Sequence, residues 1–190
     1  MTLTDESEAG ATKVTEAGEG RPVLVLGAGF AGSAAFTALA RRFRVLVMDA
    51  APADITAWIA DRGFDKLGLV GLGAAAGPAL AAAAAAGEAV NALVLVSPLG
   101  LPLGDADGPL KPLLWDVATP KCVLYGDRDP AARNLAALKT ELFRSYVVLV
   151  FDAGTDIAAE RPEAFASAAG DFLDRQGRFN FITDSVAIST

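Results

Sequence analysis

The 190-residue chain contains no histidine and a single cysteine, Cys122. Without histidine the chain has no imidazole to act as a general base, and most zinc sites are excluded, so no metal site is predicted. One cysteine cannot form an internal disulfide and is typical of a reducing compartment, which predicts a cytoplasmic protein. Because Cys122 opens an apolar stretch, we interpret it as a small core residue and not as a reactive thiol.

Basic residues are scarce as well. The chain has 16 Lys and Arg residues against 23 Asp and Glu residues, and its net charge is −7. Residues 1–20 carry five of the acidic residues and one basic residue, so much of the excess lies in this short stretch. No basic stripe is present of the kind that a nucleic-acid partner requires, and none is expected.

Residues 1–20 also lack the basic and apolar regions of a signal peptide, and their polar, small-residue composition predicts a disordered acidic tail. Residues 67–87 carry no charge, but they consist mostly of Ala and Gly and include Pro78. This pattern favours a buried strand, turn and helix, and no membrane contact is predicted.

From Pro22 onward, short apolar runs alternate with helix-type segments. Strands that are apolar on both faces are typical of a parallel sheet covered by helices, so we predict an α/β fold with a mainly parallel, doubly wound sheet of about six strands. The expected strands are 23–27, 44–49, 67–71, 92–97, 122–126 and 147–151. The expected helices are 31–42, 53–62, 74–87, 131–144 and 160–174. Residues 21–175 would form this domain, and residues 176–190 would form a strand-like tail.

The stretch VLVLGAGFAGS contains the G-x-G-x-x-G pattern of a dinucleotide-binding βαβ unit. In that interpretation Gly27 makes the tight turn, Gly29 admits the pyrophosphate and Gly32 allows close helix–strand packing. Asp49 would accept hydrogen bonds from the ribose hydroxyls. A site for NAD or FAD is therefore one alternative.

Three later segments resemble elements of the α/β-hydrolase fold superfamily. Residues 66–98 resemble its strand, nucleophile elbow, helix and following strand, CVLYGDRDP resembles the turn with the catalytic acid, and residues 150–173 resemble the histidine loop and closing helix. The resemblance covers roughly residues 22–175. It implies a minimal hydrolase core without a cap domain, in which the family's N-terminal antiparallel strands are missing.

Two residues of the family's catalytic triad are replaced in this sequence. The elbow pattern G-x-S-x-G reads Gly71-Leu72-Gly73-Ala74-Ala75, so Gly73 stands at the position of the nucleophile. Thr155 stands at the position of the histidine, and threonine cannot shuttle a proton near neutral pH. Only the acid position, Asp129, is retained. The resemblance therefore implies a degenerate member, a pseudo-hydrolase.

The same resemblance gives the glycine-rich loop another interpretation. The family's His-Gly-Phe-x-Gly-Ser sequence becomes Ala28-Gly29-Phe30-Ala31-Gly32-Ser33, which creates G-x-G-x-x-G by coincidence. The loop would then be the remnant of an oxyanion loop, with backbone donors at Phe30 and Ala74. The residual pocket would be lined by Ala28, Gly29, Phe30, Ala74 and Ser97, together with Gly73, Leu99 and Thr155.

Three functions follow from these patterns. The first is a catalytically inactive α/β-hydrolase-fold protein that acts as a binding or accessory subunit. The second is a small-molecule-binding protein, or an enzyme without a triad, that uses the residual pocket. The third is the NAD or FAD site described above. A protein partner or self-association is expected, with the tail at 176–190 adding a strand to a partner's sheet or covering an exposed sheet edge.

Overall fold

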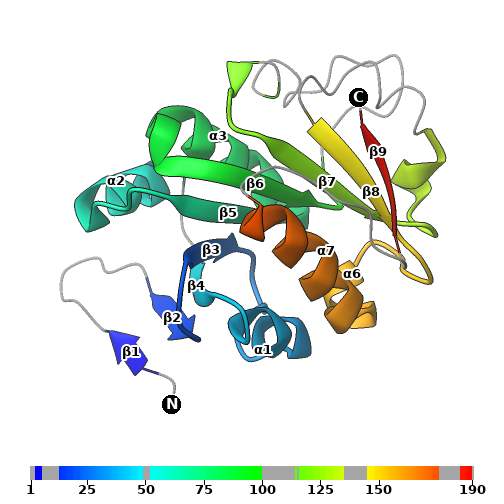
Figure 1. Cartoon of the computed structure of the whole chain (residues 1–190), viewed down its shortest axis with the longest axis horizontal. Coiled ribbons are helices and arrows are strands. Elements are labelled where there is room, and N and C mark those ends of the chain that lie inside the picture. The colour runs from blue at the N-terminus through cyan, green and yellow to red at the C-terminus, as the bar shows by residue number, and fades with distance from the viewer. Residues whose placement is uncertain are drawn as a thin grey trace.

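The computed structural model describes residues 3–5, 13–48, 52–99, 114, 116–134, 145–175 and 185–189. Within these residues, one nine-stranded sheet runs through the molecule in the order β1-β2-β4-β3-β5-β6-β7-β8-β9 (Figure 1). The strands are β1 (Leu3–Asp5), β2 (Val14–Ala17), β3 (Pro22–Leu26), β4 (Arg44–Met48), β5 (Leu67–Leu72), β6 (Val90–Val96), β7 (Lys121–Gly126), β8 (Ser145–Val150) and β9 (Ser185–Ser189).

The centre of the sheet is parallel, because β4, β3, β5, β6, β7 and β8 pair in parallel with one another in this order. These are the six strands expected from the apolar runs, and the predicted fold class is confirmed. Side chains alternate between two cores: Val23 and Val25 of β3 belong to one, and Leu24 and Leu26 to the other. Both faces of the strand are therefore buried, as the uninterrupted apolar sequence requires.

Helices cover both faces of the sheet. The first core contains side chains of α1 (Ala34–Ala40) and α7 (Pro162–Asp174), and the second contains side chains of α2 (Pro52–Arg62) and α3 (Ala76–Ala86). Figure 1 shows α1 and α7 together on one side and α2 and α3 together on the other. The shorter helices are α6 (Ile157–Glu160) and the 3₁₀ turns η1 (Gly73–Ala75), η2 (Gly87–Ala89) and η3 (Pro130–Asn134).

Helix boundaries differ from the expected ones where a cap or a proline intervenes. The expected helix 31–42 starts only at Ala34, because the Ser33 hydroxyl accepts a hydrogen bond from the Phe36 N–H (3.1 Å). The expected helix 160–174 is two helices, α6 and α7, with Pro162 at the start of α7. Of the expected helix 131–144, the structure describes residues up to 134, which form part of η3.

At both edges of the sheet, the structure differs from what the sequence predicts. Disorder is wrong for the described parts of residues 1–20, because β2 pairs antiparallel with β4 and β1 pairs antiparallel with β2. N-terminal antiparallel strands, expected to be missing, are therefore present. The strand-like character of the C-terminal tail is confirmed for β9, but β9 pairs antiparallel with β8, at the opposite edge from β1 (Figure 1).

An ion pair holds β2 against the sheet. Arg44 donates to Glu16 through Nε (2.6 Å) and through a terminal nitrogen (3.1 Å), so the pair is bidentate. The hydrogen bond from Arg44 lowers the pKa of Glu16 below its usual range. This contact explains how an acidic segment can form a strand: Glu16 meets an arginine 28 residues away in the chain.

Transmembrane helices are not found in the described part of the chain: none of its helices has the length and apolar character to cross a bilayer.

Candidate active-site remnant

The candidate site lies at the carboxyl edge of the parallel strands, where ligands bind in open α/β sheets. β5 ends at Leu72, and Gly73 turns the chain into η1 and α3 with φ of +54°. This left-handed backbone is one that glycine adopts without strain. A Cβ at Gly73 would meet no atom within 4 Å, whereas a Cβ at Gly71 would lie 2.7 Å from the Ala79 Cβ. Gly71 is therefore required for close packing, and Gly73 faces open space.

A pocket of about 360 Å³ opens beside Gly73. It brings together five residues that sequence reasoning placed at the site: Ala28, Gly73, Ser97, Leu99 and Thr155. These residues come from the ends of β3, β5, β6 and β8, so the sheet topology makes them neighbours. Among the described residues, the lining consists of Ala28, Leu72, Gly73, Val96, Ser97, Leu99, Thr155, Asp156, Ile157 and Ala158.

Three other predicted pocket residues, Gly29, Phe30 and Ala74, are not among the lining residues. The Phe30 ring is buried in the core, where it makes edge contacts with Phe36 and Phe165 at centroid distances of 6.2 and 5.8 Å. Ala74 is exposed in the middle of η1. Phe30 was expected to line the pocket, but its ring packs into the core and is not part of the described lining.

Asp129 does not line the pocket and is buried in the turn after β7. Its Oδ1 accepts a hydrogen bond from the Ala131 N–H (2.9 Å). This turn is tied to the loop that carries Thr155: the Asp127 carboxylate accepts from the Ala153 N–H (3.2 Å), and the Arg128 N–H donates to the Ala153 carbonyl (2.9 Å). The two loops that follow β7 and β8 therefore form one unit.

Glu160 also holds the loop that carries Thr155 in place, through hydrogen bonds of its carboxylate. Its carboxylate accepts from the Gly154 N–H (3.0 Å) and from the Arg128 guanidinium (3.0 Å), and Arg128 also donates to the Asp152 carbonyl (2.7 Å). The hydrogen bond from Gly154, reinforced by Arg128, lowers the pKa of Glu160 below its ordinary value of 4.5. The ionised form of Glu160 therefore stabilises the loop.

Glu160→Gln is expected to lower the stability of the folded protein at pH 7, because it weakens both contacts. Since the folded-state pKa of Glu160 is lowered, the contribution of its charge is present above pH 4.5 and is lost as the pH falls through the folded-state pKa. The difference between wild type and variant in urea-unfolding midpoint should shrink as the pH falls below 4.5. A difference that stays constant from pH 7 to pH 3 would contradict this role of the carboxylate.

Ser97 is a buried polar residue among those that line the pocket. It follows β6 with φ of +39°, a conformation that a non-glycine residue rarely adopts, and it is 5% exposed. Its N–H donates to the Leu124 carbonyl (2.8 Å). Its hydroxyl oxygen is buried and has no hydrogen-bond partner among the described residues. A strained residue with an unsatisfied hydroxyl at a pocket points to a functional position.

The unsatisfied hydroxyl predicts an unusual response to substitution. Ser97→Ala is expected to leave the free energy of unfolding unchanged or to raise it by up to about 1 kcal/mol, because it removes a buried polar atom without breaking a bond. Thr119→Val is the matched control, since the Thr119 hydroxyl is also buried but donates to the Val90 carbonyl (3.1 Å). It should lose about 1 kcal/mol. Urea unfolding tests both; equal losses would contradict the assignment.

No protein-family model matches the sequence, and no curated protein matches it. Solved structures do match. A serine hydrolase involved in carbazole degradation superposes with a TM-score of 0.75 at 20% identity, covering 92% of this chain and 100% of its own. A thermophilic esterase from Thermogutta terrifontis gives 0.71 at 18% identity, covering 94% and 100%. A carboxylesterase from Bacillus subtilis gives 0.67 at 16% identity, covering 91% of each chain. The chain has the α/β-hydrolase fold.

Within this α/β-hydrolase fold, at least one glycine of the glycine-rich loop does not have the role that a dinucleotide-binding loop would require. A Cβ at Gly32 would meet no atom within 4 Å, so Gly32 is not needed for close helix–strand packing. The following helix α1 is seven residues long, and the Ser33 side chain already accepts from one of its first N–H groups. Asp49 lies outside the described residues. An NAD or FAD site at Gly27, Gly29 and Gly32 stays an untested alternative.

Cys122 is fully buried in β7, as its apolar surroundings predicted. Burial in this apolar core of the α/β-hydrolase fold raises the pKa of its thiol far above the usual range. The thiolate form is therefore negligible at neutral pH, and Cys122 is not a nucleophile at this site.

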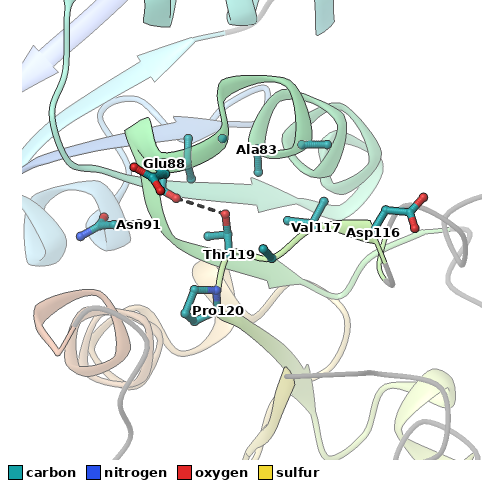
Figure 2. Close-up of a pocket in the computed structure, with 11 residues that line it drawn as sticks. Ala83, Glu88, Asn91, Asp116, Val117, Thr119 and Pro120 are labelled. Atoms are coloured by element: carbon teal, nitrogen blue, oxygen red, sulfur yellow. Dashed lines mark hydrogen bonds between the residues drawn. The ribbon is translucent and has the colours of Figure 1, made fainter.

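A second hollow, of about 400 Å³, lies at the amino ends of the parallel strands, where β6 and β7 begin. Glu88 and Asp116 lie at its two ends, and the Thr119 hydroxyl donates to the Val90 carbonyl on its wall (Figure 2). Its buried hydroxyl is thus already satisfied, unlike that of Ser97. Ligand sites of the α/β-hydrolase fold lie at the carboxyl edge, so this hollow is a weaker candidate.

Sequence reasoning missed four residues of the pocket: Leu72, Val96, Ile157 and Ala158. Leu72 and Val96 are the last residues of β5 and β6, and could have been inferred from their neighbours Gly73 and Ser97. The other two lie at the start of α6, which the expected helix 160–174 omitted. The signal for this helix was Asp156, whose carboxylate accepts from the Ala159 N–H (3.1 Å) and caps α6.

Proposed function

We propose that this chain is a catalytically inactive α/β-hydrolase-fold protein that acts by binding, as a receptor or accessory subunit. The observation that carries the proposal is Gly73, which stands at the strand–helix turn with φ of +54° and has no side chain to attack a substrate. Enzymes that use this fold for acyl transfer place a serine on such a turn. The turn is retained here and the hydroxyl is not.

The rest of the site supports the same proposal. Thr155 lies in the same pocket as Gly73, at the position that the resemblance assigns to histidine, and no histidine exists elsewhere in the chain to replace it. Ser97 lines the pocket, but without an imidazole its hydroxyl has no base of suitable pKa. The known activities of the matched hydrolases therefore do not transfer to this chain under the proposal.

Ester turnover tests the proposal. We expect the purified protein to hydrolyse p-nitrophenyl butyrate no faster than an equal concentration of heat-denatured protein. A matched variant, Ser97→Ala, shows whether any residual rate comes from the remaining pocket hydroxyl. Saturable hydrolysis by the wild type, abolished in a pocket variant such as Ser97→Ala or Thr155→Val, would contradict the proposal and support an enzyme without a triad.

Binding of a protein partner or a second copy through residues 176–190 remains part of the proposal. Among the described strands, β9 lies at one edge of the sheet and pairs only with β8, so its other side could pair with a further strand. A chain truncated after Arg175 should then lose self-association or partner capture, as measured by light scattering and pull-down. An unchanged oligomeric state and partner set in the truncated chain would remove the tail from the proposal.

A further inference from the structure

One residue of the pocket at Gly73 is not explained by packing: Ser97 has a strained backbone, and its hydroxyl has no hydrogen-bond partner among the described residues. We propose that this pocket binds a small uncharged organic molecule with an apolar body and a single carbonyl or hydroxyl oxygen, and that Ser97 is the residue that selects for this oxygen. The inference rests on the proposed binding function and narrows it to one class of ligand.

The size and the walls of the pocket determine the apolar part of the ligand. Its volume of about 360 Å³ lies near the lower end of the range for small-molecule sites, about 300–1,000 Å³. Leu72, Val96 and Ile157 contribute aliphatic side chains, and Gly73 leaves the centre open. Leu99 is 65% exposed at the pocket, and a bound apolar molecule would cover part of its side chain. A compact apolar ligand therefore gains from burial here.

The charges of the described residues around the pocket disfavour an anion. Among these residues, the lining contains one ionisable side chain, Asp156, and no lysine or arginine. The nearby Arg128 is engaged by Glu160 and by the Asp152 carbonyl, and Arg161 donates to the Phe151 carbonyl (3.0 Å). A carboxylate or phosphate would enter without a counter-charge and next to a carboxylate, which is unfavourable in a partly desolvated site.

Ser97 supplies the polar part of the recognition. A buried hydroxyl without a partner is unfavourable, and a ligand oxygen that pairs with it removes that penalty only when the ligand is bound. Rotation about χ1, which moves a serine hydroxyl between staggered positions, lets Oγ turn toward a ligand. Because the hydroxyl both donates and accepts, it pairs with a carbonyl or with an alcohol. A molecule without an oxygen would leave Ser97 unsatisfied and bind less tightly.

Three probes of similar shape test this recognition: acetophenone, which has a neutral carbonyl; ethylbenzene, which has no polar atom; and benzoate, which is an anion. We expect acetophenone to shift the amide NMR signals of Gly73, Ser97 and Thr155. It should bind about threefold to tenfold more tightly than ethylbenzene, the usual effect of one hydrogen bond, and at least tenfold more tightly than benzoate.

The variant Ser97→Ala makes the test specific. It should weaken the binding of acetophenone about threefold to tenfold and leave the binding of ethylbenzene unchanged. Thr119→Val, at the opposite ends of the strands, should change the affinity for neither probe. The inference is overturned if acetophenone does not shift the pocket amides, if benzoate binds as tightly, or if Ser97→Ala affects acetophenone and ethylbenzene equally.

Failure of the proposed function has a separate signature. If the protein is an enzyme, phenyl acetate, the ester analogue of the acetophenone probe, is converted to phenol. If only the ligand class is wrong, phenyl acetate stays intact, and the affinities measured from the pocket amide shifts do not follow the expected order of the three probes.

Discussion

The double variant Gly73→Ser with Thr155→His is expected to hydrolyse p-nitrophenyl acetate at least about 100-fold faster than the wild type, because a positioned general base contributes about 10²–10⁴-fold. Gly73 has the left-handed backbone of a nucleophile turn, and a Cβ there meets no atom within 4 Å. Thr155 lines the same pocket. Asp129 lies in the turn whose residues Asp127 and Arg128 bond directly to Ala153.

Neither single variant should show this gain, since a serine without a base and an imidazole without a nucleophile are each incomplete. Adding Asp129→Asn to the double variant should remove most of the activity if the acid orients the imidazole. Thermal melts confirm that each variant is folded; Gly73→Ser should cost about 1 kcal/mol, because serine is strained at positive φ. A folded double variant as inactive as the wild type would show that these positions do not correspond to those of a triad.

Gly126→Ala is expected to lower the free energy of unfolding by about 3 kcal/mol, near the upper end for overpacking. A Cβ at Gly126 would lie 2.2 Å from both the Ala153 and the Gly154 carbonyl oxygens, and these are backbone atoms that cannot rotate away. The loops after β7 and β8 would be forced apart. A urea-unfolding curve measures the loss through its midpoint.

Gly63→Ala is the matched control for this substitution. Gly63 has φ of +62°, and a Cβ there meets no atom within 4 Å, so the variant carries only the conformational strain of about 1 kcal/mol. If Gly126→Ala lost no more stability than Gly63→Ala, the close contact between the two loops would be disproved. The same contact explains why the turn with Asp129 and the loop with Thr155 keep their relative positions without a histidine between them.

The central sheet was predictable because its signal is local. Each of the six parallel strands is mostly apolar, and burial on both faces follows from that pattern. β2 gave no such signal, because VTEA is short and half polar, and Glu16 becomes acceptable only through its ion pair with Arg44. β9 was recognisable as strand-like, but its partner β8 lies too far away in the chain to be inferred from composition.

The positions of site residues that follow a strand could be predicted from the sequence. The orientation of individual side chains could not. Gly73, Ser97 and Thr155 converge because they follow parallel strands of one sheet. The sequence around Phe30 does not reveal that its ring turns into the core against Phe36 and Phe165. Likewise, the unsatisfied hydroxyl of Ser97 depends on atoms from several strands, so only the three-dimensional structure identifies it.

Labelling by a serine-directed fluorophosphonate, measured by intact-protein mass, tests the absence of an activated nucleophile most directly. The reagent reacts with a hydroxyl only when a base and oxyanion donors activate it. Under conditions in which the double variant Gly73→Ser with Thr155→His gains one adduct, we predict that the wild type retains its unmodified mass. A stoichiometric adduct on wild-type Ser97, Thr155 or any other pocket residue would contradict the account.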